Sequence, residues 1–250
     1  MKFGFGGRSV TVNIADWAAL SAEVLRRFRA REGFALATIN LDHLVKLRRS
    51  PEFLAAYEGQ DLVVADGWPI VWLSRLAGRP VDLMPGSDSI LPLCRLAAQA
   101  GVQVALVGST QKALDGAARV LCEEVPGLEI SLRHAPAGLF DPTGDEADAI
   151  LHQLNAAEVG LCFLALGAPK QETLAARGRK IAPHVGFASI GAGLDFLSGD
   201  QKRAPQWVRS LAMEWLWRAL SSPMRLGPRY LRCILILPRQ VLAALLLRFS

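Results

Sequence analysis

Short runs of consecutive apolar residues alternate along most of the chain with longer segments in which apolar residues recur at helical spacing. A run without polar alternation is typical of a strand that is buried on both faces of a parallel sheet. Strands of this kind are expected at 34–40, 61–66, 102–108, 159–167 and 185–193, with a weaker strand at 129–135 and a short alternating strand at 8–13.

Helical spacing, with glycine, proline or basic residues near the segment ends, predicts the elements between these strands. Helices are expected at 16–31, 41–58, 69–78, 86–101, 111–124 and 144–155, with a break near Pro51. Strands and helices that alternate in this way predict an α/β fold, a Rossmann-like, doubly wound and mainly parallel sheet.

The pattern changes near residue 196, where tryptophans and arginines mix with apolar residues. We therefore expect an α/β domain over 1–195 and a basic, Trp-rich helical appendage over 196–250. Residues 201–250 carry a net charge of +8, whereas residues 1–200 carry −3. This asymmetry favours an acidic partner at one end of the molecule: nucleic acid, anionic lipid or a substrate with a pyrophosphate.

The last apolar run contains Pro238 and Arg239, so a membrane-spanning helix is disfavoured. Arginines among aromatic and apolar residues instead predict a segment that lies in the membrane interface. On an unbroken helix several arginines would share one face, although Pro223, Pro228 and Pro238 make an unbroken helix doubtful. The alternative is a helix pair packed on the body with a solvated basic face. The arginines concerned are Arg218, Arg225, Arg229, Arg232 and Arg239.

Polar residues follow two of the predicted strands. Asp66 comes directly after "LVVA" and could act as a general base or cap the next helix. Thr38 and Asn40 end another strand and could bind sugar hydroxyls or phosphate oxygens, or cap a helix. In a parallel α/β sheet ligands bind at the carboxyl ends of the strands, so one crevice is expected to contain these residues.

Two further turns could bind an anion. Lys170 and Gln171 follow Pro169, at a helix start where a lysine and backbone N–H groups suit a phosphate. Gly108 and Ser109 end the strand at 102–108 and suit a phosphate or a ribose. Ordinary helix capping is the alternative at both turns.

Several familiar signatures are absent from the sequence. It contains no P-loop, no G-x-G-x-x-G and no D-x-D, which argues against NTPases, dinucleotide oxidoreductases and metal-clamped nucleotide sites. The four histidines form no recognisable metal set or triad, and the four scattered cysteines are expected to be reduced core thiols. The N-terminus shows no secretory signal pattern.

The segments "TINLDH", "VVADGWPIVW", "GSD", "LGAPKQE", "GAGLDFLSGDQKRAPQWVR" and "EWLWRALSSPMRLGPRYL" together resemble the WecG/TagA/CpsF family of bacterial glycosyltransferases. The resemblance implies inverting transfer of a sugar from a UDP-sugar to a polyprenyl-diphosphate-linked saccharide, with no metal or other cofactor. It also implies a peripheral location at the inner face of the cell membrane, in the synthesis of cell-surface polysaccharide. Nucleic acid is then not expected as a partner, and self-association stays open.

Carried over by position, Asp66 would be the catalytic base. Leu83 departs from the family, which usually has an arginine there to stabilise the diphosphate; Arg79 is one substitute. A non-catalytic module that binds nucleotide sugars is therefore kept as the alternative function. The substrate site would contain Thr38, Asn40, Asp88, Gly108, Ser109, Lys170 and Gln171, and the lipid diphosphate and head groups would meet Arg218, Arg225, Arg229 and Arg232.

Overall fold

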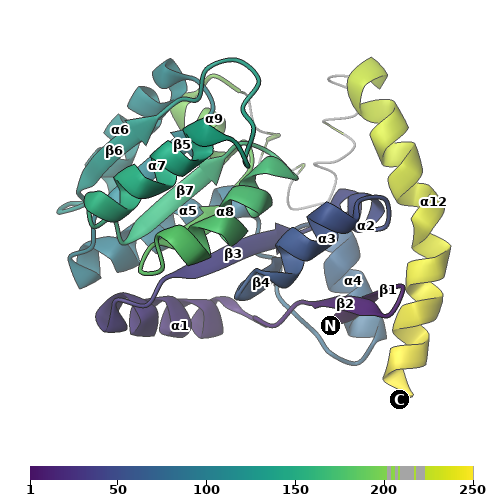
Figure 1. Cartoon of the computed structure of the whole chain (residues 1–250). Coiled ribbons are helices and arrows are strands. Elements are labelled where there is room, and N and C mark those ends of the chain that lie inside the picture. The colour runs from purple at the N-terminus through teal and green to yellow at the C-terminus, as the bar shows by residue number, and fades with distance from the viewer. Residues whose placement is uncertain (202–203, 206–207, 209–216, 218–222, 250) are drawn as a thin grey trace.

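The fold is a six-stranded parallel sheet with helices on both faces, as the alternation of elements predicts (Figure 1). The computed structural model describes residues 1–201, 204–205, 208, 217 and 223–249. The strand order is β4-β3-β8-β7-β5-β6. The strands are β3 (Phe34–Ile39), β4 (Leu62–Ala65), β5 (Val104–Gly108), β6 (Ile130–His134), β7 (Leu161–Ala165) and β8 (Gly186–Ser189).

The helices follow the predicted segments closely, with two differences. The segment 41–58 forms two helices because Ser50 caps a new one at Pro51. The predicted strand 185–193 stops at Ser189 because a short helix begins at Gly193. The helices of the body are α1 (Trp17–Ala30), α2 (Leu41–Leu47), α3 (Pro51–Glu58), α4 (Trp68–Leu76), α5 (Gly86–Ala100), α6 (Gln111–Glu124), α7 (Asp145–Ala156), α8 (Lys170–Ile181) and α9 (Gly193–Ser198).

The N-terminus forms an antiparallel hairpin of β1 (Lys2–Phe5) and β2 (Arg8–Thr11). The predicted strand at 8–13 is its second arm, and the first arm was not predicted. Phe3, Phe5 and Val10 point from the hairpin into a core cluster shared with α2, α3 and α4. The hairpin therefore belongs to the body of the protein.

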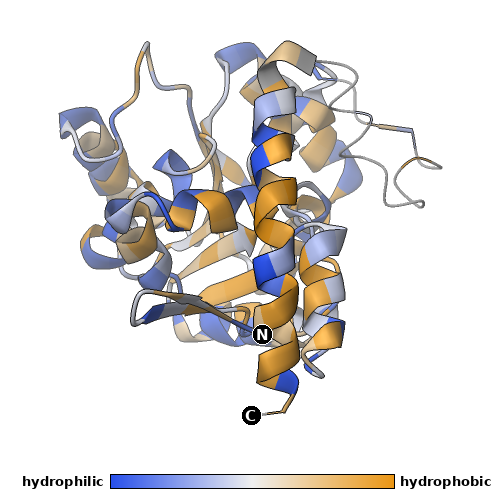
Figure 2. Cartoon of the chain, turned by 90° about the vertical axis from the view of Figure 1, so that its right-hand side faces the viewer, coloured by the Kyte–Doolittle hydropathy of each residue, from blue (hydrophilic) through white to orange (hydrophobic). Residues whose placement is uncertain are grey.

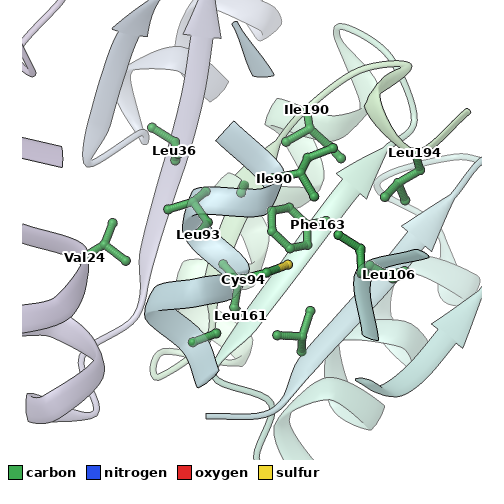
Figure 3. Packing of buried hydrophobic residues seen from close by; sticks show 14 of the residues in the cluster. Val24, Leu36, Ile90, Leu93, Cys94, Leu106, Leu161, Phe163, Ile190 and Leu194 are labelled. Carbon is green, nitrogen blue, oxygen red and sulfur yellow. The ribbon is translucent and has the colours of Figure 1, made fainter. Parts of the chain in front are cut away.

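Side chains of alternate residues along the strands build separate cores on the two faces of the sheet. On one face α1, α5, α6 and α9 cover Leu36, Leu106 and Phe163 (Figure 3). On the other face α7 and α8 cover β5, β7 and β8. The hairpin and α2, α3 and α4 cover the β3–β4 end of that second face. Both faces are buried, which explains why the strands read as continuous apolar runs.

In the C-terminal segment, residues 223–248 form a continuous helix, α12 (Pro223–Arg248, 26 residues). The doubt raised by its prolines is corrected, since the helix runs through Pro228 and Pro238. Both prolines are exposed, so the backbone hydrogen bonds that they remove lie near the surface, where solvent can replace them. The stretch Leu226–Arg248 is long and apolar enough to cross a membrane, by length and composition only.

One side of α12 packs on the body. Cys233 and Ala244 are buried and belong to the cluster that holds α2 and α4. Leucine and isoleucine side chains on the opposite side are exposed, as the apolar colouring of the outer surface of α12 illustrates (Figure 2). The helix therefore has two apolar faces. One contacts the body and the other faces outward.

Candidate active site

Asp66 lies directly after β4, at the carboxyl edge of the sheet. Its carboxylate Oδ2 accepts a hydrogen bond from Asn40 Nδ2 at 3.1 Å. The capping alternative for Asp66 does not hold, because α4 has Gly67 as its N-cap and no side chain caps it. Gly67 has φ of +99°, a conformation that L side chains rarely adopt, and this sharp turn takes the chain from Asp66 into α4.

Asn40 caps α2, one of the two functions that the sequence left open, and it also contacts Asp66. Its Oδ1 accepts from the backbone N–H of His43 at 3.0 Å and so caps α2, while its Nδ2 donates to Asp66. The cap fixes which end of the amide faces the carboxylate. Asp66 is thus held at the carboxyl end of β4 by Asn40, which is itself fixed by its cap on α2.

Thr38 lies inside β3 and is 5% exposed. Its hydroxyl donates to the backbone oxygen of Ser189 at 3.4 Å, which links β3 to β8. The structure therefore places Thr38 just below the edge at which Asn40 and Asp66 meet.

Gln171, in the first turn of α8, is 2% exposed. Its Oε1 accepts from the backbone N–H of Gly191 at 3.1 Å, and its Nε2 donates to Glu172 Oε1 at 2.8 Å. Gln171 thus joins the turn after β7 to the turn after β8, at the same edge of the sheet.

Glu172 is fully buried, an environment that disfavours the charged form of a carboxyl group. Burial raises its pKa to about 7, although the hydrogen bond from Gln171 acts in the opposite direction. Among the described residues its Oε2 has no hydrogen-bond partner. A carboxyl group that titrates near neutral pH therefore lies next to the proposed site.

His43 and Tyr57 form a buried pair close to the same edge. His43 Nδ1 and Tyr57 Oη are 2.6 Å apart. Burial lowers the pKa of His43 to about 3, and the charges of Lys46 and Arg229 act in the same direction. Burial also raises the pKa of Tyr57, and the negative charges of Glu172 and Asp66 add to this effect. Both side chains are therefore neutral at pH 7.

The turn after β5 brings Gly108 and Ser109 to the edge. Gly108 has φ of +113°, and a Cβ there would lie 2.5 Å from the backbone of Ala165, so the position requires glycine. The Ser109 hydroxyl donates to the Asp195 carboxylate, while Thr110, not Ser109, caps α6. Asp195, from the α9 segment, is thereby drawn to this part of the edge.

Lys170 and Asp88 lie in the first turns of α8 and α5. Lys170 is half-buried and Asp88 is exposed. Gly86, at the start of α5, lies close to Ile190 after β8. The helices α4, α5 and α8 all start at this edge without a side-chain cap, so their first backbone N–H groups can meet an anion.

Leu83 lies beside the end of β4, where it forms a parallel bridge with Ala65. An arginine at this position would therefore start next to Asp66. Arg79 does not replace it, because it lies beyond the far end of α4 and its charge lowers the pKa of the Met1 amino group, after the larger effect of burial. The substitute cation proposed from the sequence is thus at the wrong end of α4.

Arg229, in α12, comes near the edge. Its charge reaches both His43 and Cys233, and its Nε is buried without a hydrogen-bond partner among the described residues. Its guanidinium lies 5.1 Å from the centroid of the Tyr230 ring. Arg225 and Arg232 also lie in α12, whereas Arg218 is outside the described residues.

Four residues of this region were not predicted: His43, Tyr57, Glu172 and Asp195. Glu172 follows Gln171 directly, but nothing in the sequence distinguishes a buried glutamate from an exposed one in a first helical turn. Tyr57 reaches His43 only because the chain breaks at Ser50 and turns α3 against α2. The one available signal was Asp195 in "GAGLDF", a polar residue after an apolar strand.

Comparison with known proteins shows the family of the chain. Residues 8–249 match the Glycosyl transferase WecG/TagA/CpsF family. The chain is also 26% identical over 215 residues to the N-acetylglucosaminyldiphosphoundecaprenol N-acetyl-beta-D-mannosaminyltransferase of Bacillus spizizenii, covering 86% of this chain and 79% of that protein. With its sheet edge and motifs in the expected order, the protein belongs to the WecG/TagA/CpsF family of glycosyltransferases.

Proposed function

We propose that the protein transfers a sugar from a UDP-sugar to a polyprenyl-diphosphate-linked saccharide, with inversion at the anomeric carbon and without a metal ion. The relative from Bacillus spizizenii is named for an acceptor of this kind and for an N-acetylmannosaminyl donor group. UDP-N-acetylmannosamine is therefore the first donor to test.

The observation that carries this proposal is the hydrogen bond from Asn40 to Asp66. A carboxylate fixed at a strand mouth can remove the proton from an acceptor hydroxyl as that oxygen attacks the anomeric carbon. The bond from the anomeric carbon to the UDP oxygen breaks on the opposite side, which inverts the configuration. The proton passes to Asp66 and the electron pair leaves with UDP.

The departing diphosphate needs positive charge, which Leu83 does not supply. The uncapped N-termini of α4, α5 and α8 provide N–H groups and the positive ends of helix dipoles. Lys170 and Arg229 add cationic side chains near the same edge. These groups support the expectation that the reaction does not depend on a metal.

The outer surface of α12 supports a peripheral location at the cytoplasmic face of the membrane. Because one side of α12 packs on α2 and α4, a spanning orientation would require the helix to leave the body. A helix that lies on the bilayer keeps these contacts and brings the edge of the sheet close to a lipid-linked acceptor.

The test is a UDP-release assay with a panel of UDP-sugars and a lipid-diphosphate acceptor. We expect release with one donor, unchanged by EDTA, and a product whose NMR spectrum shows the inverted anomeric configuration. Retention of configuration would contradict the mechanism. Tight UDP binding without turnover for any donor would favour the non-catalytic module that Leu83 keeps as the second candidate.

A further inference from the structure

A hollow of about 430 Å³ lies between the β1–β2 hairpin, the α2–α3 turn and α12. It is at the C-terminal end of α2, whereas Asn40 and Asp66 lie at the N-terminal end, so it is separate from the active site. Figure 1 shows α2 and the hairpin beside α12. The lining includes apolar Phe5, Leu47 and Leu54 and basic Arg8, Arg48 and Arg239.

The positive charge of the hollow is not balanced. Arg8 is paired with Glu58. In the part of the chain that the structure describes, neither Arg48 nor Arg239 forms an ion pair with a carboxylate, and the Nε of Arg48 is buried without a hydrogen-bond partner. Burial lowers the pKa of Arg48, and the charge of Arg239 adds to this effect. Two guanidinium groups that repel each other would both gain from a shared anion.

The hollow also borders an apolar surface. Arg232 and Arg239 are seven residues apart and so lie on the same side of α12. By helical spacing, Leu235 and Leu242 lie beside them. Figure 2 shows that the outer surface of α12 is largely apolar. Its exposed residues include Leu231, Ile234, Leu235, Leu242 and Leu246.

We propose that this hollow binds the phosphate of an anionic phospholipid, with Arg48 and Arg239 on the phosphate oxygens and the acyl chains along the exposed side of α12. Any phosphate could meet the two arginines, but the adjoining apolar surface favours a lipid. The inference rests on the membrane location proposed above and goes beyond it, because it assigns a second lipid site at the opposite end of α2 from Asp66.

The experiment is flotation of the full chain with vesicles of phosphatidylcholine, with and without phosphatidylglycerol, in the absence of any sugar donor. We expect Arg48→Gln/Arg239→Gln to lower binding to the anionic vesicles about five- to thirtyfold. Arg49→Gln is the matched control, because Arg49 is an exposed neighbour that does not line the hollow. It should bind nearly as well as the wild type.

Two results would overturn the proposal. If Arg49→Gln loses as much binding as the double variant, the arginines contribute only non-specific electrostatic attraction to the membrane and form no lipid site. If the double variant no longer binds inorganic phosphate in a calorimetric titration but still binds vesicles normally, the hollow serves a soluble phosphate. Arg239→Gln alone, an exposed position, repeats the test if the double variant does not fold. Vesicle binding needs no turnover, so a failure of the glycosyltransfer proposal would leave this result unaffected.

Discussion

Polar side chains at the carboxyl edge of the sheet are hydrogen-bonded within the protein, whereas those on the outer surface of α12 are exposed to solvent. At the edge, Asn40, Asp66, Gln171 and Glu172 bond to one another or to the backbone, and Gln171 and Glu172 are buried. On α12, Arg232 and Arg239 are exposed next to an apolar surface. Hydrogen bonds between side chains at the edge fix their positions, as catalysis requires. Exposed arginines beside apolar side chains suit a surface that contacts a membrane.

The strongest test of the edge is Asp66→Asn. If Asp66 is the base, turnover should fall about 10²–10⁴-fold while the fold persists, because asparagine preserves the shape but cannot accept a proton. UDP release measures this, and circular dichroism checks the fold. The exposed carboxylate variant Asp82→Asn should keep wild-type turnover, and equal turnover in both variants would remove Asp66 from the mechanism.

Glu172→Gln tests whether burial at the edge tunes a carboxyl group. The folded protein holds the Glu172 proton up to about pH 7, whereas the unfolded chain releases it near 4.5. The contribution of Glu172 to stability is therefore fully present below pH 4.5 and is lost as the pH rises through 7. Between pH 5 and 8 the wild type should lose about 2–3 kcal/mol of unfolding free energy relative to Glu172→Gln.

Urea unfolding at several pH values measures this difference. The pKa of His43 is lowered to about 3, so its contribution to stability is present above about pH 6.5 and is lost as the pH falls. This contribution is the same in both proteins and cancels when their free energies of unfolding are compared. Glu124→Gln, at an exposed position of α6, should run parallel to the wild type. If the stability of Glu172→Gln changes with pH in the same way as that of the wild type, burial does not raise the pKa of Glu172.

Leu235→Ser/Leu242→Ser tests the outer surface of α12 without disturbing the body. Both leucines are exposed, so the thermal midpoint should hardly change. Vesicle binding should weaken about a hundredfold or more, since burial of each of the two leucines is worth about 1.5–3 kcal/mol. Leu139→Ser, another exposed leucine outside α12, is the control in the same flotation assay. Undiminished binding would assign the apolar surface to something other than a membrane.

Arg229→Gln tests the point where the two regions meet. We expect KM for the lipid-linked acceptor to rise about tenfold, with a smaller change in kcat, because one charged hydrogen bond to a phosphate is lost. Initial rates over a range of acceptor concentrations separate the two constants. The exposed Arg119→Gln on α6 should leave both constants unchanged. A large fall in kcat alone would instead place Arg229 in the chemical step.

The fold and the position of the candidate site residues at the sheet edge followed from local signals, because apolar strands of a parallel sheet are continuous and end where polar residues begin. Asp66 and Asn40 were predictable for this reason. The partnership of His43 with Tyr57 and the burial of Glu172 were not, because they depend on how α3 packs against α2 and α8. The sequence does not show that Pro228 and Pro238 are exposed, so it leaves the continuity of α12 open.

Cys233 gives α12 a chemical reporter of its own movement. Its thiol is buried against the body, and burial raises its pKa to about 11, so it should react slowly with alkylating reagents while the helix stays docked. In a Cys122→Ser background, which removes the exposed thiol, the labelling rate with and without vesicles would show whether α12 leaves the body when it meets lipid. An unchanged rate would mean that the enzyme binds the membrane as a preformed surface.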